Sequence, residues 1–282
     1  MTVEENLSVL EQDLAGKNAV VTGASRGIGR AIALHLAMRG ASVIGTCSSA
    51  GSLHHLETLE QLVTRTFTAA GLQPPLIFGI AADVTSDETP ELVARTVVER
   101  FDSKLNILVN NAAYYEFRPM GRLDAAHVNR ILSGNITALV ILMDTLYRQN
   151  LFQPDSRVVN VSSDTAKMTN LPFPGMLIFS ATKCAMESLT RAWADTLGHN
   201  ASSLGTTVNS LSVGATATDA MKNSPPALQD IAEKVIRNNK AELGVMGRAE
   251  DIANVAGLLV SKRAGWVTGS VIAASGGATK IL

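Results

Sequence analysis

The segment from residue 18 to residue 39 places a glycine-rich turn between a short apolar run and an amphipathic helix. The apolar run Asn18–Thr22 leads into Thr22-Gly23-Ala24-Ser25-Arg26-Gly27-Ile28-Gly29, and helical spacing continues to Arg39. Glycines at such positions allow a tight turn and a close approach of a pyrophosphate, while the following helix start offers amide donors and a favourable dipole. The chain is therefore predicted to fold around a strand–turn–helix unit that binds a dinucleotide.

The same alternation of apolar run, turn and helix continues along the chain. Further strands are predicted at Ser42–Thr46, Leu76–Ala81, Leu105–Val109, Arg157–Ser162, Thr206–Leu211 and Ser270–Ala274. Helices are predicted at Leu53–Ala70, Glu88–Arg100, Ala125–Gln149, Met176–Leu197 and Ala249–Val260. Apolar strands separated by helices are typical of a parallel sheet covered on both faces. We therefore predict an α/β fold, a Rossmann-type doubly wound parallel sheet in a single domain, with its ligand beyond the carboxyl ends of the strands.

Two segments lie outside this regular pattern. Residues 1–14 are interpreted as an N-terminal extension that precedes the domain at 15–282. Residues 218–247 contain Pro225-Pro226 and a polar, helix-like stretch directly after a predicted strand. A long insertion at the carboxyl end of a strand favours a substrate lid, and a surface excursion is the alternative.

The composition limits which binding partners and which cellular compartment are expected. With 282 residues and 46% hydrophobic content the chain can bury one large core, and its net charge of −1 gives no broad field for nucleic acid or an anionic membrane. Cys47 and Cys184 form neither a disulfide framework nor a metal motif. The start of the chain, Met1–Asn6, has no apolar core of a signal peptide, and the longest apolar run, Ala138–Met143, is too short to span a bilayer. We expect a cytoplasmic protein without a metal site.

The spacing T-G-x-x-x-G-x-G resembles that of the short-chain dehydrogenase/reductase family, and further matches extend over about residues 15–278. Asn110-Asn111-Ala112-Ala113 resembles the family's N-N-A-G segment, and Val213-Gly214 with Thr218-Asp219 resembles its P-G-x-x-x-T segment beside the nicotinamide. Asp83-Val84 is similar to the pair that contacts adenine. The resemblance implies that the cofactor is held by Gly23, Ser25, Arg26, Gly27, Ile28, Gly29, Ser48, Ser49, Asp83, Val84, Asn110, Ala112, Lys183, Gly214, Thr216 and Thr218.

The end of the second predicted strand indicates which dinucleotide is bound. An NAD enzyme commonly places a carboxylate about 20 residues past the glycine motif, where it binds the ribose 2′-hydroxyl. Gly45-Thr46-Cys47-Ser48-Ser49 holds none. A guanidinium from Arg26 together with the hydroxyls of Ser48 and Ser49 suits a 2′-phosphate instead, unless Arg26 is only a solvated loop charge. The sequence favours NADP(H).

The resemblance also implies an active site, in which one residue type departs from the family. Its catalytic asparagine, serine and lysine match Asn135, Ser163 and Lys183, but Phe179 stands where the family has its proton-donating tyrosine. The separation of Ser163 from Phe179 is longer than usual, with the extra residues within Thr169–Gly175. Asp164 is either a group that orients or protonates the substrate or a solvated loop aspartate. Tyr114 and Tyr115, after the N-N-A-A segment, are either apolar pocket wall or substitute hydroxyl donors.

A phenyl ring has no proton to donate, and this limits the chemistry. Reduction of a carbonyl needs its oxygen protonated, whereas hydride addition to an iminium ion gives a neutral amine directly. We therefore expect an NADP(H)-dependent oxidoreductase of non-standard mechanism that reduces an imine or iminium in a biosynthetic, secondary-metabolite pathway. It is similar in type to fungal alkaloid-pathway family members that lack the usual catalytic set and guide a [4+2] cycloaddition.

Two other functions stay open on the sequence alone. One is a non-redox cyclase, Diels–Alderase or isomerase that uses the same scaffold, and the other is a catalytically silent NADP-binding protein. The expected ligands are the cofactor and a small-molecule substrate. The family pairs its long helices across two-fold axes, which implies a homodimer or homotetramer through 125–149 and 176–197.

Overall fold

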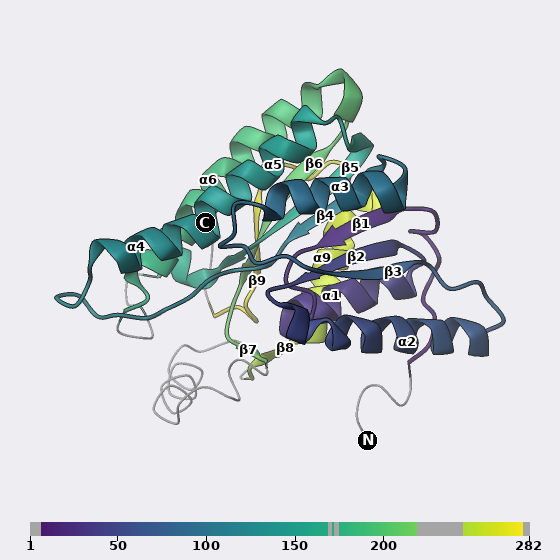
Figure 1. The fold of residues 1–282 in the computed structure, drawn as a ribbon, viewed down its shortest axis with the longest axis horizontal. Coiled ribbons are helices and arrows are strands. Elements are labelled where there is room, and N and C mark those ends of the chain that lie inside the picture. Colours follow the sequence, from purple (N-terminus) through teal and green to yellow (C-terminus); the bar gives the residue numbers. More distant parts are fainter. Residues whose placement is uncertain (1–6, 169–170, 172–174, 219–244, 279–282) are drawn as a thin grey trace.

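Seven parallel strands form one sheet at the centre of the molecule (Figure 1). The computed structural model describes residues 7–168, 171, 175–218 and 245–278. The strand order is β3-β2-β1-β4-β5-β6-β9. Their bounds are β1 Asn18–Val21, β2 Ser42–Cys47, β3 Ile77–Ala81, β4 Leu105–Asn110, β5 Phe152–Ser163, β6 Thr207–Val213 and β9 Val271–Ala274. This confirms the predicted doubly wound α/β fold.

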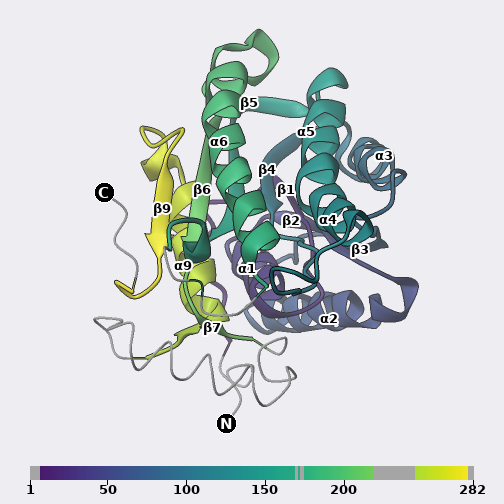
Figure 2. The same cartoon turned by 90° about the vertical axis from the view of Figure 1, so that its left-hand side faces the viewer.

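Helices cover both faces of the sheet, as Figure 2 shows. The core on one face includes Ile32 of α1 (Gly27–Met38), Leu59 of α2 (His54–Ala69) and Ala256 of α9 (Ala249–Val260). The core on the other face is formed with α3 (Thr89–Phe101), α5 (Ala138–Arg148) and α6 (Leu177–His199). Burial on both faces explains why the strands are almost uniformly apolar.

The strand order reverses at β1, which places the ligand site. β1 pairs with β2 on one side and with β4 on the other, both in parallel. The connections leave the sheet in opposite directions at this point, so a crevice opens beyond the carboxyl ends of the strands. The glycine-rich turn after β1 and the N-N-A-A segment after β4 both reach that edge.

The helix predicted over 125–149 is divided in the structure. α4 (Ala125–Leu132) and α5 are joined by a π-helical turn, Ser133–Thr137, a local irregularity that is common at functional sites. By length and a hydropathy of 1.2 alone, the run 125–148 could cross a membrane, and 39% of its apolar window is buried inside the fold. Here α5 supplies core residues that pack on the sheet, such as Leu146.

The structure describes part of each segment that lies outside the regular pattern, residues 1–14 and 218–247. Leu10 N–H donates to Met38 O and Leu14 N–H to Arg39 O, each at 3.0 Å, so residues 7–14 lie along the end of α1. Of the predicted lid, residues 219–244 lie outside the described part of the chain. The predicted lid is bordered by a short parallel pair, β7 (Thr216–Ala217) with β8 (Gly247–Arg248).

Candidate active site

The glycine-rich turn brings backbone atoms closer than side chains would allow. Gly23 and Gly27 have φ of +66° and +56°, the left-handed region in which glycine is favoured. A Cβ on Gly29 would lie only 2.2 Å from Gly23 O. Asn111 braces the turn from β4, since its Nδ2 donates to Thr22 O at 2.9 Å. The turn therefore presents bare backbone at the start of α1, as a pyrophosphate requires.

A cleft of about 560 Å³ runs along this turn and the end of β2. None of the described residues that line it is acidic, and its cationic side chain is Arg26, which is exposed beside Ser48. The other lining residues among those predicted from the sequence are Gly23, Ser25, Gly27, Ile28, Gly29, Val84, Ala112 and Thr218. The residues present thus fit a dinucleotide that carries a 2′-phosphate.

Six of the predicted cofactor residues do not line this cleft. Lys183, Gly214 and Thr216 line an adjoining cavity, and Ser49, Asp83 and Asn110 line neither. The Ser49 hydroxyl lies 3.4 Å from that of Ser52, and the Asp83 carboxylate accepts hydrogen bonds from the backbone and hydroxyl of Thr85 at 2.9 Å. Asn110 is buried, and its Nδ2 donates to Asn160 Oδ1 at 2.8 Å.

Asn111 is one of several lining residues that the sequence did not assign to the cofactor. It lines the cleft, and its backbone N–H donates to the Thr22 hydroxyl at 2.9 Å. The N-N-A-A motif contained this signal. Which of its two adjacent asparagines faces the cofactor depends on how β4 ends, and that is a tertiary feature.

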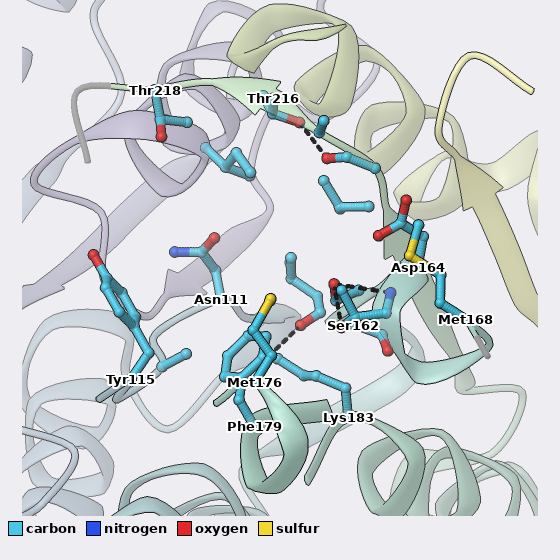
Figure 3. A pocket seen from close by; sticks show the side chains of 18 residues that line it. Asn111, Tyr115, Ser162, Asp164, Met168, Met176, Phe179, Lys183, Thr216 and Thr218 are labelled. Carbon is cyan, nitrogen blue, oxygen red and sulfur yellow. Dashed lines mark hydrogen bonds between the residues drawn. The ribbon is translucent and has the colours of Figure 1, made fainter. Parts of the chain in front are cut away.

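A second cavity of about 290 Å³ continues from the cofactor cleft toward β5 and α6 (Figure 3). The two share Ile28, Asn111, Ala113, Tyr115 and Thr218. Most of its wall is apolar and includes Met168, Met176 and Val213. The predicted residues Ser163, Asp164, Phe179, Lys183, Gly214 and Thr216 also line it. It is the candidate substrate site, because it opens on the cofactor cleft and contains the predicted catalytic positions.

Phe179 and Lys183 stand one turn apart on α6 and face this cavity together. Lys183 Nζ lies 5.5 Å from the centroid of the Phe179 ring and donates a hydrogen bond to Val161 O at 2.8 Å. Lys183 is 3% exposed, and this burial lowers its pKa from 10.5 to about 8. The face of the Phe179 ring therefore meets the ammonium where a phenol would otherwise lie.

Ser163 ends β5 at the opposite wall, and Asp164 begins the turn that follows it. The Ser163 hydroxyl accepts hydrogen bonds from Thr165 N at 3.3 Å and Thr165 Oγ1 at 2.9 Å, so its own proton is left to donate to another group. Asp164 is 6% exposed, and Figure 3 shows its carboxylate across the cavity from Tyr115. This wall of the cavity thus combines a hydroxyl that can donate with a buried carboxylate.

The turn that carries Asp164 is fixed to α6 by a row of side chains on one helix face. The Ser180 hydroxyl donates to Thr165 O at 2.6 Å, and the Cys184 thiol donates to Ala166 O at 3.0 Å. Lys167 Nζ forms an ion pair with Glu187 at 2.8 Å. Residues i, i+4 and i+7 lie along one face of a helix. One helix therefore holds both Phe179 and Lys183 and also the turn that brings Asp164 to the cavity.

Asn135 acts inside the protein, beneath the wall of the site. Its Oδ1 accepts from Tyr114 N at 2.7 Å, while its Nδ2 donates to Tyr114 O at 2.9 Å and to Thr182 Oγ1 at 3.3 Å. It sits in the π-helical turn and is 3% exposed. Asn135 thus fixes the segment after β4 and does not line the cavity.

The two tyrosines of that segment lie differently. Tyr114 Oη donates to Glu116 Oε2 at 3.2 Å, and Arg118 and Arg130 also bind Glu116, at 2.7 and 3.2 Å. Hydrogen bonding to Arg118 is the main reason that the pKa of Glu116 falls to about 2. Tyr115 lines the cavity and is 54% exposed. Of the two alternative hydroxyls, only that of Tyr115 belongs to a residue lining the site.

Among the residues that the structure describes, no group of three or more His, Cys, Asp or Glu side chains could hold a metal ion.

Comparison with known proteins places this site in a family. A family model described as enoyl-(acyl carrier protein) reductase matches residues 23–279. The chain is 33% identical over 264 residues to 3-oxoacyl-[acyl-carrier-protein] reductase FabG of Pseudomonas aeruginosa, covering 94% of this chain and 98% of the relative. It is 31% identical over 267 residues to the short-chain dehydrogenase/reductase FrzI of a Cladobotryum species, covering 94% and 96%. The chain belongs to the short-chain dehydrogenase/reductase family.

A solved short-chain dehydrogenase shows the family's cofactor. The enzyme from Burkholderia cenocepacia, crystallised in complex with NADP, is 28% identical, with a TM-score of 0.78 over 94% of this chain and 99% of that one. The glycine-rich turn, β4 end and Lys183 of the present chain therefore occur in a short-chain dehydrogenase/reductase fold. Against that background, Phe179 is a departure at the position where the family's proton donor is expected.

Proposed function

We propose that this protein is an NADP(H)-dependent oxidoreductase that reduces a carbon–nitrogen double bond, an imine in its protonated iminium form, to an amine. The observation that carries the proposal is the Phe179 ring, 5.5 Å from Lys183 Nζ, at the position of the family's proton donor. The cofactor is NADP(H), as the cleft beside Arg26 and the NADP-bound neighbour support. When bound, it supplies the hydride.

The substrate's charge decides what else the site must provide. Hydride addition to a carbonyl leaves an alkoxide that needs a proton, whereas addition to an iminium carbon moves the π electrons onto nitrogen and leaves a neutral amine. No general acid is needed for the second reaction. The ketone reduction in the name of the Pseudomonas relative therefore does not transfer to this chain, because Phe179 cannot donate the proton.

The buried carboxylate supports a cationic substrate. Asp164 lines a largely apolar cavity, where a charge interacts far more strongly than in water. An iminium ion would be drawn to this carboxylate, and the Ser163 hydroxyl is free to donate to another polar group of the substrate. The Lys183 ammonium is held by Val161 O and lies over the Phe179 ring.

A second candidate follows from the apolar wall of the same cavity. Met168, Met176 and Phe179 form a surface that could hold a flexible substrate in a reactive conformation, and orientation alone can supply much of the rate of a cyclisation. In this reading the protein is a non-redox cyclase or isomerase on the short-chain dehydrogenase/reductase scaffold, with NADP(H) as part of the wall. A secondary-metabolite pathway and the cytoplasm are the setting that we propose for either reaction.

One assay separates these functions. NADPH oxidation is followed with a panel of cyclic iminium salts and the matched cyclic ketones, and products are examined by mass spectrometry with NADPH deuterated at the transferred position. We expect iminium reduction with deuterium in the amine and no measurable ketone reduction. Asp164→Asn should slow iminium reduction without weakening NADPH binding, while Asp144→Asn, an exposed change on α5, serves as the control.

Other outcomes would contradict the proposal. Ketone reduction as fast as iminium reduction would show that another proton donor operates. Product without net NADPH consumption would favour the non-redox reaction. Cofactor binding with no turnover of any panel member would favour a silent NADP-binding protein.

A further inference from the structure

A cavity of about 270 Å³ lies at the amino ends of the strands, at the edge opposite the active site. It is lined by Asp13, Leu14, Lys17, Asn106, Ile107, Asp155, Arg157, Val260 and Lys262. These residues come from the segment before β1, the starts of β4 and β5, and the end of α9. Nothing in the reaction proposed above uses them.

The floor of this cavity holds a buried cation with no anionic partner. Arg157 is 7% exposed, and its Nη1 donates to three main-chain carbonyls, of Asp155 at 2.8 Å, Ser156 at 2.9 Å and Gly205 at 3.3 Å. Its Nε is buried without a hydrogen-bond partner in the structure. Within the described residues it forms no ion pair at 4.0 Å or less. Carbonyl groups bind its N–H groups but do not neutralise its charge.

A buried guanidinium such as that of Arg157 destabilises the folded state unless a counter-charge is supplied. A buried charge in proteins is normally paired, because the desolvation penalty is otherwise uncompensated. That penalty is visible in the pKa of Arg157, which burial lowers and the nearby Asp155 only partly restores. An anion in the cavity would meet this need.

The mouth of the cavity adds two further cations. Lys17 and Lys262 are exposed, and neither side chain has an ion pair or hydrogen bond among the described residues. Of the two carboxylates in the wall, Asp13 is already held by Arg39 through bonds of 2.8 and 2.5 Å. Three cations therefore face one unmatched carboxylate, that of Asp155, and the cavity keeps an excess of positive charge.

We propose that this cavity is a second ligand site, which binds a small oxyanion, a phosphate or a carboxylate, between Arg157, Lys17 and Lys262. The guanidinium supplies positive charge at the floor, and the two ammonium groups close over the ligand from the mouth. The volume of about 270 Å³ admits a small phosphorylated or multicarboxylate metabolite. The site is separate from the 2′-phosphate position beside Arg26, at the other edge of the sheet.

The test measures thermal stability and calorimetric binding of inorganic phosphate and of citrate, with NADP present at saturation so that the 2′-phosphate position is filled. Sodium chloride at equal ionic strength is the reference. We expect a saturable rise in melting temperature, about 3 °C at ten times the dissociation constant. Binding of phosphate alone, of citrate alone or of both would support the site and identify its ligand class.

Variants at the exposed mouth keep the fold intact and decide the outcome. Lys262→Gln should weaken oxyanion binding about tenfold, and Lys17→Gln/Lys262→Gln should abolish it, because each removes a charge-assisted bond. Arg65→Gln, an exposed charge removal on α2, should leave it unchanged. Equal stabilisation by chloride, or undiminished binding in the double variant, would overturn the proposal.

Discussion

Replacing Phe179 by tyrosine should give this protein carbonyl reductase activity, because it supplies the proton donor that phenylalanine lacks. The ring already lines the substrate cavity, so the hydroxyl is added at the wall of the site. Lys183 Nζ lies 5.5 Å from the ring centroid, and opposite unit charges about 5–6 Å apart attract each other by about 3 kcal/mol at an effective dielectric constant of about 20. This attraction lowers the pKa of the new phenol and opposes the effect of its burial.

The expected gain follows from what a positioned acid supplies. General acid catalysis contributes roughly 10²- to 10⁴-fold, and the altered spacing between Ser163 and the α6 position favours the lower end. We therefore expect kcat/KM for small cyclic ketones to rise about 10²-fold in Phe179→Tyr. Iminium reduction, which needs no proton, should change much less.

The assay is NADPH oxidation with paired ketones and iminium salts, supported by NADPH titration to show that the cofactor site is intact. Phe117→Tyr is the matched control, because Phe117 packs edge-on against Phe179 with centroids 6.4 Å apart and is not among the described residues that line the cavity. Brisk ketone reduction by the unmodified protein would refute the reasoning and point to Tyr115 or Asp164 as the donor. An equal gain in Phe117→Tyr would show that Lys183 is irrelevant.

Four further outcomes can be checked. Arg26→Ala should weaken NADPH binding by about 1.5–3 kcal/mol and leave NADH binding unchanged in calorimetric titration; equal affinities of the unmodified protein for both would contradict the NADP(H) assignment. Gly29→Ala should destabilise the fold by about 1–3 kcal/mol in urea melts, since its Cβ would lie 2.2 Å from Gly23 O, whereas Gly51→Ala meets nothing closer than 3.9 Å and should be neutral. Burial lowers the pKa of Lys183 to about 8, so between about pH 8 and 10.5 the unfolded chain binds more protons than the folded one. The unfolding free energy should therefore rise with pH across that window, by up to about 3 kcal/mol, and this rise should be absent in Lys183→Met. Light scattering should show a homodimer or homotetramer, and a lone 29.7 kDa species at micromolar concentration would count against it.

The pattern of the sequence was sufficient to predict the architecture because that pattern has a direct physical cause. Strands buried on both faces must be apolar along their length, and their helices must carry one apolar face each, so alternating segments indicate a doubly wound parallel sheet. The glycines at 23, 27 and 29 were also predictable from the motif. Gly23 and Gly27 have positive φ, and a Cβ on Gly29 would lie 2.2 Å from Gly23 O, so side chains are excluded there. The absence of a hydroxyl at Phe179 also follows from the sequence alone, because it depends only on the identity of the residue.

Other features were decided only when distant segments met in space. The sequence could not show that Asp164 is 6% exposed and lines the cavity, because that depends on the row of α6 side chains that holds its turn. Nor could it show that Asn135 bonds the Tyr114 backbone or that Tyr114 turns toward Glu116. The unpaired charge of Arg157 also arises only from packing, since a guanidinium in solution has water around it and is costly only where the fold removes that water.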